Sequence, residues 1–320
     1  MAQAHRRDWN LYWRRAGNVP VFGQFTKNGD SLRIFWAEYL AQALADPERN
    51  RVLDMACGSG AVSTVAADVA ERADSGIQLF CLDYSGDAVT DLRRRMPQVG
   101  AVASDAGAAP FAGGAFDVVA SQFGLEYAGP AAFVEAARLT AANGVLCAIC
   151  HLGSGPIHRE CLDNLDTVET VLGCRFLPLA KSAFDALFAL DRGDGSAQAA
   201  QEAHRALTEA AATMRRLIET KGAQAASGTP ARLFQDVGYM YNQRRKFVPR
   251  QVFEWIDLMS GEVTAYAGRM RAMSQAALDE TAIGDIRRSL ISAGLSVEEP
   301  QKLPLGPDAE PGAWVLKAAR

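Results

Sequence analysis

The chain has 320 residues, of which 49% are hydrophobic and 22% are charged, as in an ordinary globular protein. This composition excludes disorder along the whole chain, a collagen-like repeat and a coiled-coil rod. The 33 basic and 37 acidic residues give a net charge of −4, so no global positive field draws the protein to nucleic acid or to an anionic membrane. The sequence lacks a run of 18 apolar residues and the apolar core of a signal peptide, so we expect no membrane span and a cytoplasmic location.

Residues 1–48 are predicted to form an N-terminal helical segment. Ser31 is the expected cap of a helix over residues 32–44, where apolar residues recur at helical spacing, and Asp46-Pro47 ends it. An aromatic cluster lies upstream: Trp9, Tyr12 and Trp13. This cluster forms either a flap over a ligand or a packing contact between the segment and the following sheet, and we favour packing.

Residues 49–154 alternate short apolar runs with Ala-rich helical segments. The predicted strands are 51–56, 77–83, 99–105, 116–123 and 144–151, and the predicted helices are 61–72, 86–96 and 130–141. This alternation is typical of the α/β class, with a doubly wound, mostly parallel sheet covered on both faces. Ligands of such sheets bind outside the carboxyl ends of the strands, so the polar residues that close the runs are candidates for a site.

A long helical stretch follows the fifth predicted strand. A crossover to the next strand needs only about a dozen residues, so residues 155–272 are predicted to be an inserted helical cap. Residues 273–320 then complete the core with a helix that stops at Gly294 and two antiparallel strands, which gives a seven-stranded sheet with a C-terminal antiparallel strand. Because the cap leaves from a carboxyl strand end, we hypothesise that it is a lid that excludes water from the site.

The cap is rich in aromatic and Met residues. They are Phe176, Phe184, Phe188, Phe234, Tyr239, Met240, Tyr241, Phe253, Trp255 and Met259. They line an apolar pocket, form the core of the cap itself, or make the contact of a homodimer. We expect most of them to be core residues.

The sequence VLDMACGSG, residues 52–60, carries the strongest chemical signal. A strand leads into a turn whose glycines let the backbone approach a ligand, and a helix N-terminus follows. A dinucleotide fingerprint needs a third glycine, and Ser63 stands at that place. Asp54 also suits a cationic ligand better than a pyrophosphate, so a nicotinamide dehydrogenase is the least favoured interpretation.

Two further carboxylates close the next strands. Asp83 ends the second strand, where a carboxylate can accept from both hydroxyls of a ribose. Asp105 ends the third strand, where it can accept from an exocyclic amine. A single Asp at a strand end is commonly a cap or a turn former. Three at consecutive strand ends after a Gly-rich turn indicate a nucleoside site instead.

These motifs resemble those of class I S-adenosylmethionine (SAM)-dependent methyltransferases. The first motif, Asp54 to Gly60, resembles the family's D/E-x-x-C/G-G-x-G. Similar strand ends follow at residues 82–85, 104–111 and 116–119, and Asn143-Gly144 stands where the family has Pro-Gly. The resemblance covers about residues 50–151 and returns at 278–320.

The resemblance implies SAM as the cofactor, with S-adenosylhomocysteine as its product. Asp54, Ala56 and the backbone of Gly58 and Gly60 would contact its methionyl end. Asp83 would hold the ribose and Tyr84 the adenine face, while Asp105 and Ala106 would contact the adenine edge. Gln122 and Phe123 would line the mouth through which the methyl group moves. The residues that this resemblance assigns to the cofactor are Asp54, Ala56, Gly58, Gly60, Asp83, Tyr84, Asp105, Ala106, Gln122 and Phe123.

The segment after the fourth strand, residues 121–127, lacks the N/D-P-P-Y/F turn of DNA amino-methyltransferases and contains no Cys. We therefore expect a small-molecule acceptor rather than nucleic acid. His151, Glu126 and Tyr127 are the alternative candidates for a general base or an acceptor contact. Cys147 and Cys150 have the spacing of a redox or zinc pair, but on a strand they point to opposite faces, so no metal site is predicted.

The sequence therefore predicts a SAM-dependent methyltransferase that acts on O, N, S or C of a small molecule by in-line displacement. One alternative is an RNA or protein methyltransferase, which the acidic charge balance disfavours. Another is a protein of this fold that binds a ligand without catalysis.

Overall fold

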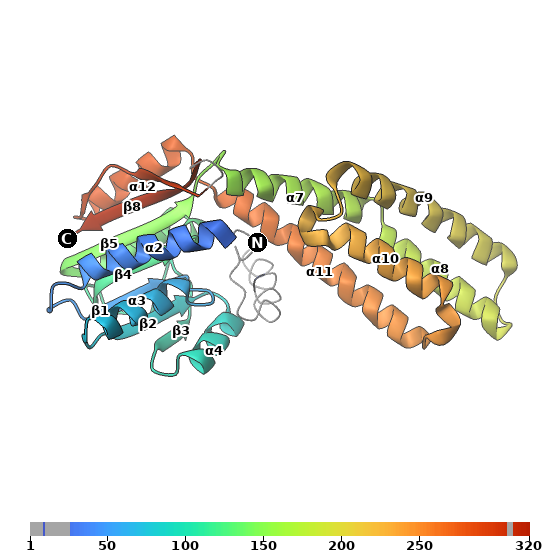
Figure 1. Cartoon of the computed structure of the whole chain (residues 1–320), viewed down its shortest axis with the longest axis horizontal. Coiled ribbons are helices and arrows are strands. Elements are labelled where there is room, and N and C mark those ends of the chain that lie inside the picture. The colour runs from blue at the N-terminus through green and yellow to red at the C-terminus, as the bar shows by residue number, and fades with distance from the viewer. Residues whose placement is uncertain (1–8, 10–25, 306–309) are drawn as a thin grey trace. The chain divides into compact units, whose positions relative to one another are not determined.

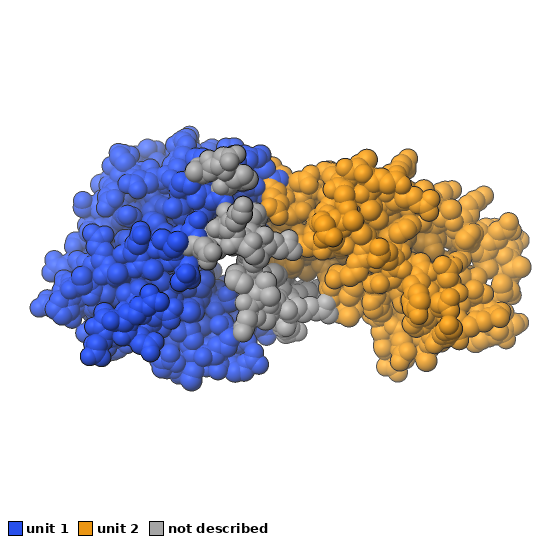
Figure 2. All heavy atoms as spheres, viewed as in Figure 1, with its two compact units in different colours: residues 1–159, 272–320 blue, residues 160–271 orange. Residues whose placement is uncertain are grey.

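The computed structural model describes Trp9, residues 26–305 and residues 310–320. The chain divides into two compact units, one of Met1–Arg159 with Ala272–Arg320 and the other of Glu160–Arg271 (Figure 2). The boundaries between the units fall inside helices α7 (Pro156–Gly173) and α11 (Pro249–Ala276).

The first unit contains the sheet. Its strands are β1 (Arg51–Met55), β2 (Gln78–Asp83), β3 (Gly100–Ala103), β4 (Phe116–Gln122), β5 (Thr140–His151), β6 (Ser296–Val297), β7 (Gln301–Pro304) and β8 (Pro311–Ala319). Its helices are α2 (Thr26–Ala43), α3 (Ala61–Arg72), α4 (Gly86–Arg95), α5 (Leu125–Ala128), α6 (Pro130–Leu139) and α12 (Glu280–Ser292). In this unit, helices separate β1 from β2, β2 from β3 and β4 from β5, whereas a loop joins β3 to β4. This order is that of the α/β class, as the sequence predicts.

The described strands form one sheet in the order β3-β2-β1-β4-β5-β8-β6, and β7 also pairs with β8. Strands β1 to β5 are parallel, and β8 is antiparallel to β5, β6 and β7. The sheet has eight strands rather than the seven predicted, because the segment after α12 pairs with β8 in two short pieces. Pro300 lies between the pieces and has no N–H to donate to a ladder.

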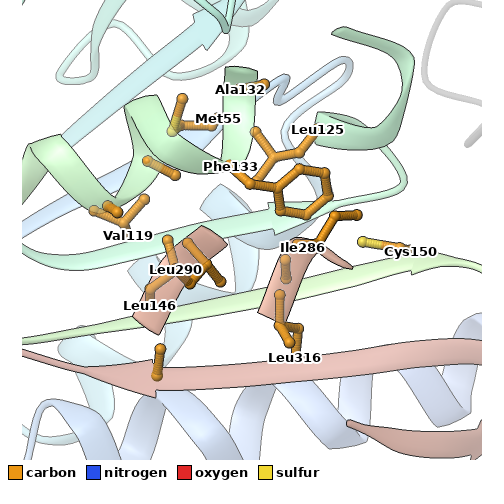
Figure 3. Close-up of a cluster of buried hydrophobic side chains, with 14 of the residues drawn as sticks. Met55, Val119, Leu125, Ala132, Phe133, Leu146, Cys150, Ile286, Leu290 and Leu316 are labelled. Atoms are coloured by element: carbon orange, nitrogen blue, oxygen red, sulfur yellow. The ribbon is translucent and has the colours of Figure 1, made fainter. Parts of the chain in front are cut away.

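Each face of the sheet has its own helical cover. Residues at alternate positions of β1, β4, β5 and β8 pack with α6 and α12, as Figure 3 shows for Leu146, Leu316, Phe133, Ile286 and Leu290. Helices α2 and α3 cross the sheet in Figure 1. The parallel strands are thus buried on both faces, and ligand access is left to their carboxyl ends.

Two elements, α2 and β5, begin several residues before their predicted starts. Helix α2 begins at Thr26, so Ser31 lies inside the helix and is not its cap. The turn-forming residues before Ser31 therefore belong to the first turns of the helix. Strand β5 begins at Thr140 rather than at Gly144. The added start of β5 pairs with β4, through Thr140 and Phe116, whereas β8 pairs with residues 145–151 of β5.

The second unit is helical. It holds most of α7 and α11, together with α8 (Phe176–Arg192), α9 (Ala197–Lys221), η1 (Ala225–Gly228), α10 (Thr229–Asn242) and η2 (Arg244–Lys246). Nine of the ten aromatic and Met residues singled out in the sequence belong to its own apolar cluster, and Tyr239 is 62% exposed. These side chains therefore mainly build a core. Within the described residues, no helix is long and apolar enough to cross a membrane.

Candidate functional site

The turn between β1 and α3 is built from left-handed backbone. Ala56 has φ +55°, Gly58 +51° and Gly60 +79°. A Cβ on Gly60 would lie 2.5 Å from Cδ1 of Leu92, so both the conformation and the space favour glycine there. The N–H of Gly60 donates to the carbonyl of Cys57 at 2.7 Å. The turn is therefore tight and brings backbone, not side chains, to the end of β1.

Asp54 lies one residue before the end of β1 and is 1% exposed. Its Oδ2 accepts from the backbone N–H of Ser63 at 3.0 Å and from the Ser63 hydroxyl at 2.5 Å. Burial raises the pKa of Asp54 to about 7, although the Ser63 bonds oppose the rise and the nearby Asp83 adds to it. Near neutral pH, a cation beside this carboxyl would stabilise its ionised form. Sequence reasoning missed the role of Ser63.

Asp83 ends β2 and holds two backbone N–H groups from different segments. Its Oδ2 accepts from the N–H of Gly58, and its Oδ1 accepts from the N–H of Ser85, both at 2.8 Å. Burial raises the pKa of Asp83, and the two bonds oppose that rise. A carboxylate offers about four acceptor positions, so each oxygen keeps capacity for a ligand hydroxyl. The next residue, Tyr84, is partly buried.

The Gly58–Asp83 bond joins two of the sequence motifs. Residues Asp54 and Cys81 are register partners on adjacent parallel strands, so the ends of β1 and β2 meet at one edge of the sheet. The sequence predicted that the two motifs share an edge. It did not predict that one motif accepts from the backbone of the other.

Asp105 and Ala106 follow β3 and differ from the other candidates in burial. Asp105 is exposed, and its Oδ1 accepts from the N–H of Gly107 at 2.8 Å, which shapes its own turn. Ala106 is buried in the apolar cluster of the first unit. The contact of these two residues with an adenine remains a prediction.

Gln122 and Phe123 end β4. Gln122 Oε1 accepts from the indole N–H of Trp36, on α2, at 2.8 Å, and Trp36 is 1% exposed. Phe123 has φ +52°, and its N–H donates to the carbonyl of Ile149 at 2.7 Å. A left-handed non-glycine residue is strained, and such residues cluster at functional sites. Nothing in the sequence around Trp36 indicates its bond to Gln122.

The three base candidates come together at the ends of β4 and β5. His151 Nδ1 lies 2.7 Å from Glu126 Oε1, and the two side chains are 2% and 0% exposed. The Tyr127 ring meets the His151 ring edge to face, with centroids 5.7 Å apart, and the Phe123 ring lies 4.4 Å from His151. The sequence offered these residues as alternatives, whereas the structure groups them.

Of the N-terminal aromatic cluster, only Trp9 is described, and its ring packs edge-on against Tyr127 at 5.5 Å. Tyr12 and Trp13 lie outside the described residues.

Two buried polar atoms near the end of β4 have no hydrogen-bond partner within the described part of the chain, Ser121 Oγ and Glu126 Oε2. Gly124 lies close to the first of them: a Cβ on Gly124 would be 3.1 Å from Ser121 Oγ and 2.4 Å from the Cβ of Ala56. The segment after β4 thus packs tightly against the turn after β1. A buried polar atom without a hydrogen-bond partner destabilises the fold. A ligand that bonds to these atoms at this edge of the sheet would remove that destabilisation.

These residues fit SAM by their chemistry. Asp83 keeps acceptor capacity for ribose hydroxyls, and Asp54 is a buried carboxyl whose ionised form a ligand cation would favour. Among the residues that the structure describes, no three His, Cys, Asp or Glu side chains gather to hold an ion. Cys147 and Cys150 are both buried.

Comparisons with known proteins agree with this chemistry. Residues 53–148 match the sequence model of a family described as a methyltransferase domain. A demethylmenaquinone methyltransferase from Beutenbergia cavernae is 37% identical over 113 residues, 35% of this chain and 45% of that protein. Another, from Renibacterium salmoninarum, is 33% identical over 125 residues, 38% of this chain and 50% of that protein. The chain thus spans about half the length of the curated relatives it matches.

Among solved structures, a putative methyltransferase in complex with the Haloferax volcanii Trm112 methyltransferase activator is 26% identical. The match covers 35% of this chain and 50% of that chain, with a TM-score of 0.29. A TM-score this low does not establish a common architecture over the whole chain.

Proposed function

We propose that this protein, which belongs through residues 53–148 to the class I SAM-dependent methyltransferase family, transfers a methyl group to a small-molecule acceptor. The bound cofactor would supply a methyl group on a positively charged sulfur. The chain's own residues would bind and orient the cofactor and the acceptor, and orientation can account for much of the rate of such a displacement.

The observation that carries the proposal is the Asp83 carboxylate at the junction of the two motifs. It is buried, it fixes the Gly-rich turn through Gly58, and it keeps acceptor capacity for a pair of hydroxyls. In the proposed complex, Asp83 binds the ribose, Asp54 lies nearest the cationic end, and Asp105 with Ala106 contacts the adenine. Gln122 and Phe123 lie at the mouth of the site.

Calorimetric titration with SAM and S-adenosylhomocysteine tests this proposal. Asp83→Ala removes a charged acceptor, which costs about 1.5–3 kcal/mol, so we expect SAM affinity to fall roughly 10- to 150-fold. Asp68→Ala, at an exposed position on α3, is the matched control and should bind SAM normally. Thermal unfolding of both variants checks that the fold is kept. Normal SAM binding by Asp83→Ala would show that the ribose lies elsewhere.

The acceptor is a separate question, because the relatives match only about half of their own length. They are named for demethylmenaquinone, so this compound in its reduced form heads the panel of acceptors to assay. We propose a small acceptor, since the net charge of −4 gives no general attraction to nucleic acid. Formation of S-adenosylhomocysteine with RNA or protein but with no small molecule would contradict this.

We also propose that the helical unit, Glu160–Arg271, is the lid of the acceptor site. Its own apolar cluster supports independent packing, and the insertion follows β5 in the chain, whose carboxyl end carries His151. Hydrogen exchange with and without S-adenosylhomocysteine and a turned-over acceptor tests this. We expect protection in the helical unit only when both are bound, and equal exchange in all states would remove the lid role.

A further inference from the structure

One carboxylate oxygen of Glu126 lies within hydrogen-bond distance of two nitrogens of a single residue, His151. Its Oε1 accepts from the backbone N–H of His151 at 3.0 Å and lies 2.7 Å from Nδ1 of the same residue. Because Glu126 Oε1 already accepts from the backbone N–H of His151, it is an acceptor toward the imidazole ring too. Nδ1 is therefore the nitrogen that carries the hydrogen in neutral His151, and Nε2 is the basic one.

We propose that Glu126 is a positioning residue that holds His151 as a general base, and that the site takes an acceptor that must lose a proton. The acceptor class is an acidic hydroxyl or carbon acid, such as a phenol or an enol. This proposal rests on the proposed function for its acceptor class, whereas the Glu126–His151 pair stands on geometry alone.

The step balances as follows. The acceptor's X–H proton passes to Nε2 of His151, and the resulting imidazolium is paired with the Glu126 carboxylate. The electron pair of X forms the X–CH3 bond as the S–CH3 bond breaks, and the pair of that bond returns to sulfur. His151 then releases the proton to water. No oxidant, reductant or metal takes part.

The backbone around the pair is built to hold it. Glu126 lies on α5, whose N-cap, Gly124, approaches Ala56 so closely that a Cβ there would be 2.4 Å from the Ala56 Cβ. Phe123, directly before Gly124, is left-handed and contacts the His151 ring. The ring of His151 is thus fixed by Glu126 at Nδ1 and by aromatic rings at its sides. The strained backbone of Phe123 and the close packing of Gly124 are the kind of features that hold a ring such as that of His151 in one orientation.

Three of the described residues beside His151 are titratable. Glu126 and Tyr127 contact it from α5, and Cys150 precedes it on β5. Burial, with the nearby Glu126, raises the pKa of the Cys150 thiol well above its usual value, so it stays neutral. Within the described residues, no Lys or Arg pairs with Glu126. The Glu126 carboxylate is therefore available to stabilise an imidazolium.

Nuclear magnetic resonance of the histidine ring nitrogens tests the pair without any acceptor or cofactor. We expect neutral His151 in the Nδ1–H form, with its signals assigned by their loss in His151→Asn. Glu126→Gln keeps the shape and removes the charge, so the Nδ1–H proton resonance of His151, deshielded by a bond to a carboxylate, should move upfield. The ring signals of His204, on α9, are the internal control and should not change. An Nε2–H form in the unchanged protein, or an unmoved Nδ1–H resonance in Glu126→Gln, would overturn the role of Glu126.

Turnover tests the acceptor class. The probes are 1,4-dihydroxynaphthalene, which loses a proton on methylation, and N,N-dimethylaniline, an amine that is mostly unprotonated at neutral pH and has no proton to lose. We expect S-adenosylhomocysteine from the first only, and a kcat about 10²-fold lower in Glu126→Gln, with SAM affinity kept and Glu126→Asp partly restoring the rate. Faster reaction of the amine, an unchanged kcat in Glu126→Gln, or no product from either probe with SAM bound would refute the acceptor class. Failure of the unchanged protein to bind SAM would instead refute the proposed function.

Discussion

The two halves of the candidate site use their acidic residues differently. At the ends of β1 and β2, Asp54 and Asp83 accept from backbone N–H groups of the turns and helices that follow those strands. At the ends of β4 and β5, Glu126 accepts from the ring of His151 as well as from its backbone. In the proposed site, the first half would fix backbone around the ligand, and the second half would fix a side chain that takes a proton.

This difference separates binding from chemistry. A carboxylate that organises backbone shapes a pocket, and its loss should weaken cofactor binding. A carboxylate that orients a histidine leaves the pocket unchanged, and its loss should lower turnover while cofactor affinity stays the same. Variants in the two halves should therefore fall into separate kinetic classes.

The largest expected effect concerns Asp54, whose folded pKa is about 7 against about 3.9 in an unfolded chain. Between these values the folded state binds more protons, so stability falls as pH rises through this window. Three pKa units correspond to a loss on the order of 4 kcal/mol. Asp54→Asn should flatten this slope when urea unfolding is measured at pH 5 and pH 8.

In the Asp54→Asn variant, the free energy of unfolding should still fall as pH rises, though less steeply. Asp83 causes this remaining dependence, because burial also raises its pKa. If the free energy of unfolding depends on pH equally in the variant and in the unchanged protein, ionising Asp54 destabilises the folded state very little, which would contradict this prediction.

The next effect concerns the contact between the two halves at Gly124. In Gly124→Ala the new Cβ would meet the Ala56 Cβ at 2.4 Å and the Ala56 carbonyl oxygen at 3.3 Å, and both belong to the tight turn after β1. Overpacking of this kind costs about 1–3 kcal/mol. We expect a lower unfolding free energy in urea and weaker SAM binding, since both halves shift. Unchanged stability would show that the halves are not packed together.

The smallest effect lies in the helical unit and has the opposite sign. Gly238, inside α10, has no neighbour within 4 Å of an added Cβ. Gly238→Ala should raise stability by about 1 kcal/mol, because Gly is a poor helix former. Thermal unfolding with and without S-adenosylhomocysteine measures this, and the ligand-induced shift should equal that of the unchanged protein. A loss of stability would indicate that Gly238 makes a close contact.

The cofactor half follows local rules that the sequence displays. Apolar runs that end near Asp54 and Asp83 predicted parallel strands, and Gly58 and Gly60 predicted a turn in which backbone approaches a ligand. The structure adds that both glycines have positive φ. Helices α3, α4 and α6 begin at the predicted residues, because the change from a short apolar run to an Ala-rich stretch is a local signal. The split of the last edge strand at Pro300 was not predicted, although proline offers the physical reason.

The half of the site at the ends of β4 and β5 is assembled by contacts between residues far apart in the sequence. Glu126 and His151 are 25 residues apart, and no spacing rule pairs them, so the sequence could only offer both as candidates. The same holds for Trp36 and Gln122, which are 86 residues apart. The helix start at Thr26 also escaped prediction, because the turn-forming residues before Ser31 favour a loop by local preference.

A crystal structure of the full chain with S-adenosylhomocysteine tests the central claim most directly. The account predicts a nucleoside across the carboxyl ends of the first strands, with both ribose hydroxyls within hydrogen-bond distance of the Asp83 carboxylate. A nucleoside bound elsewhere on the chain, or none at saturating concentration, would contradict it.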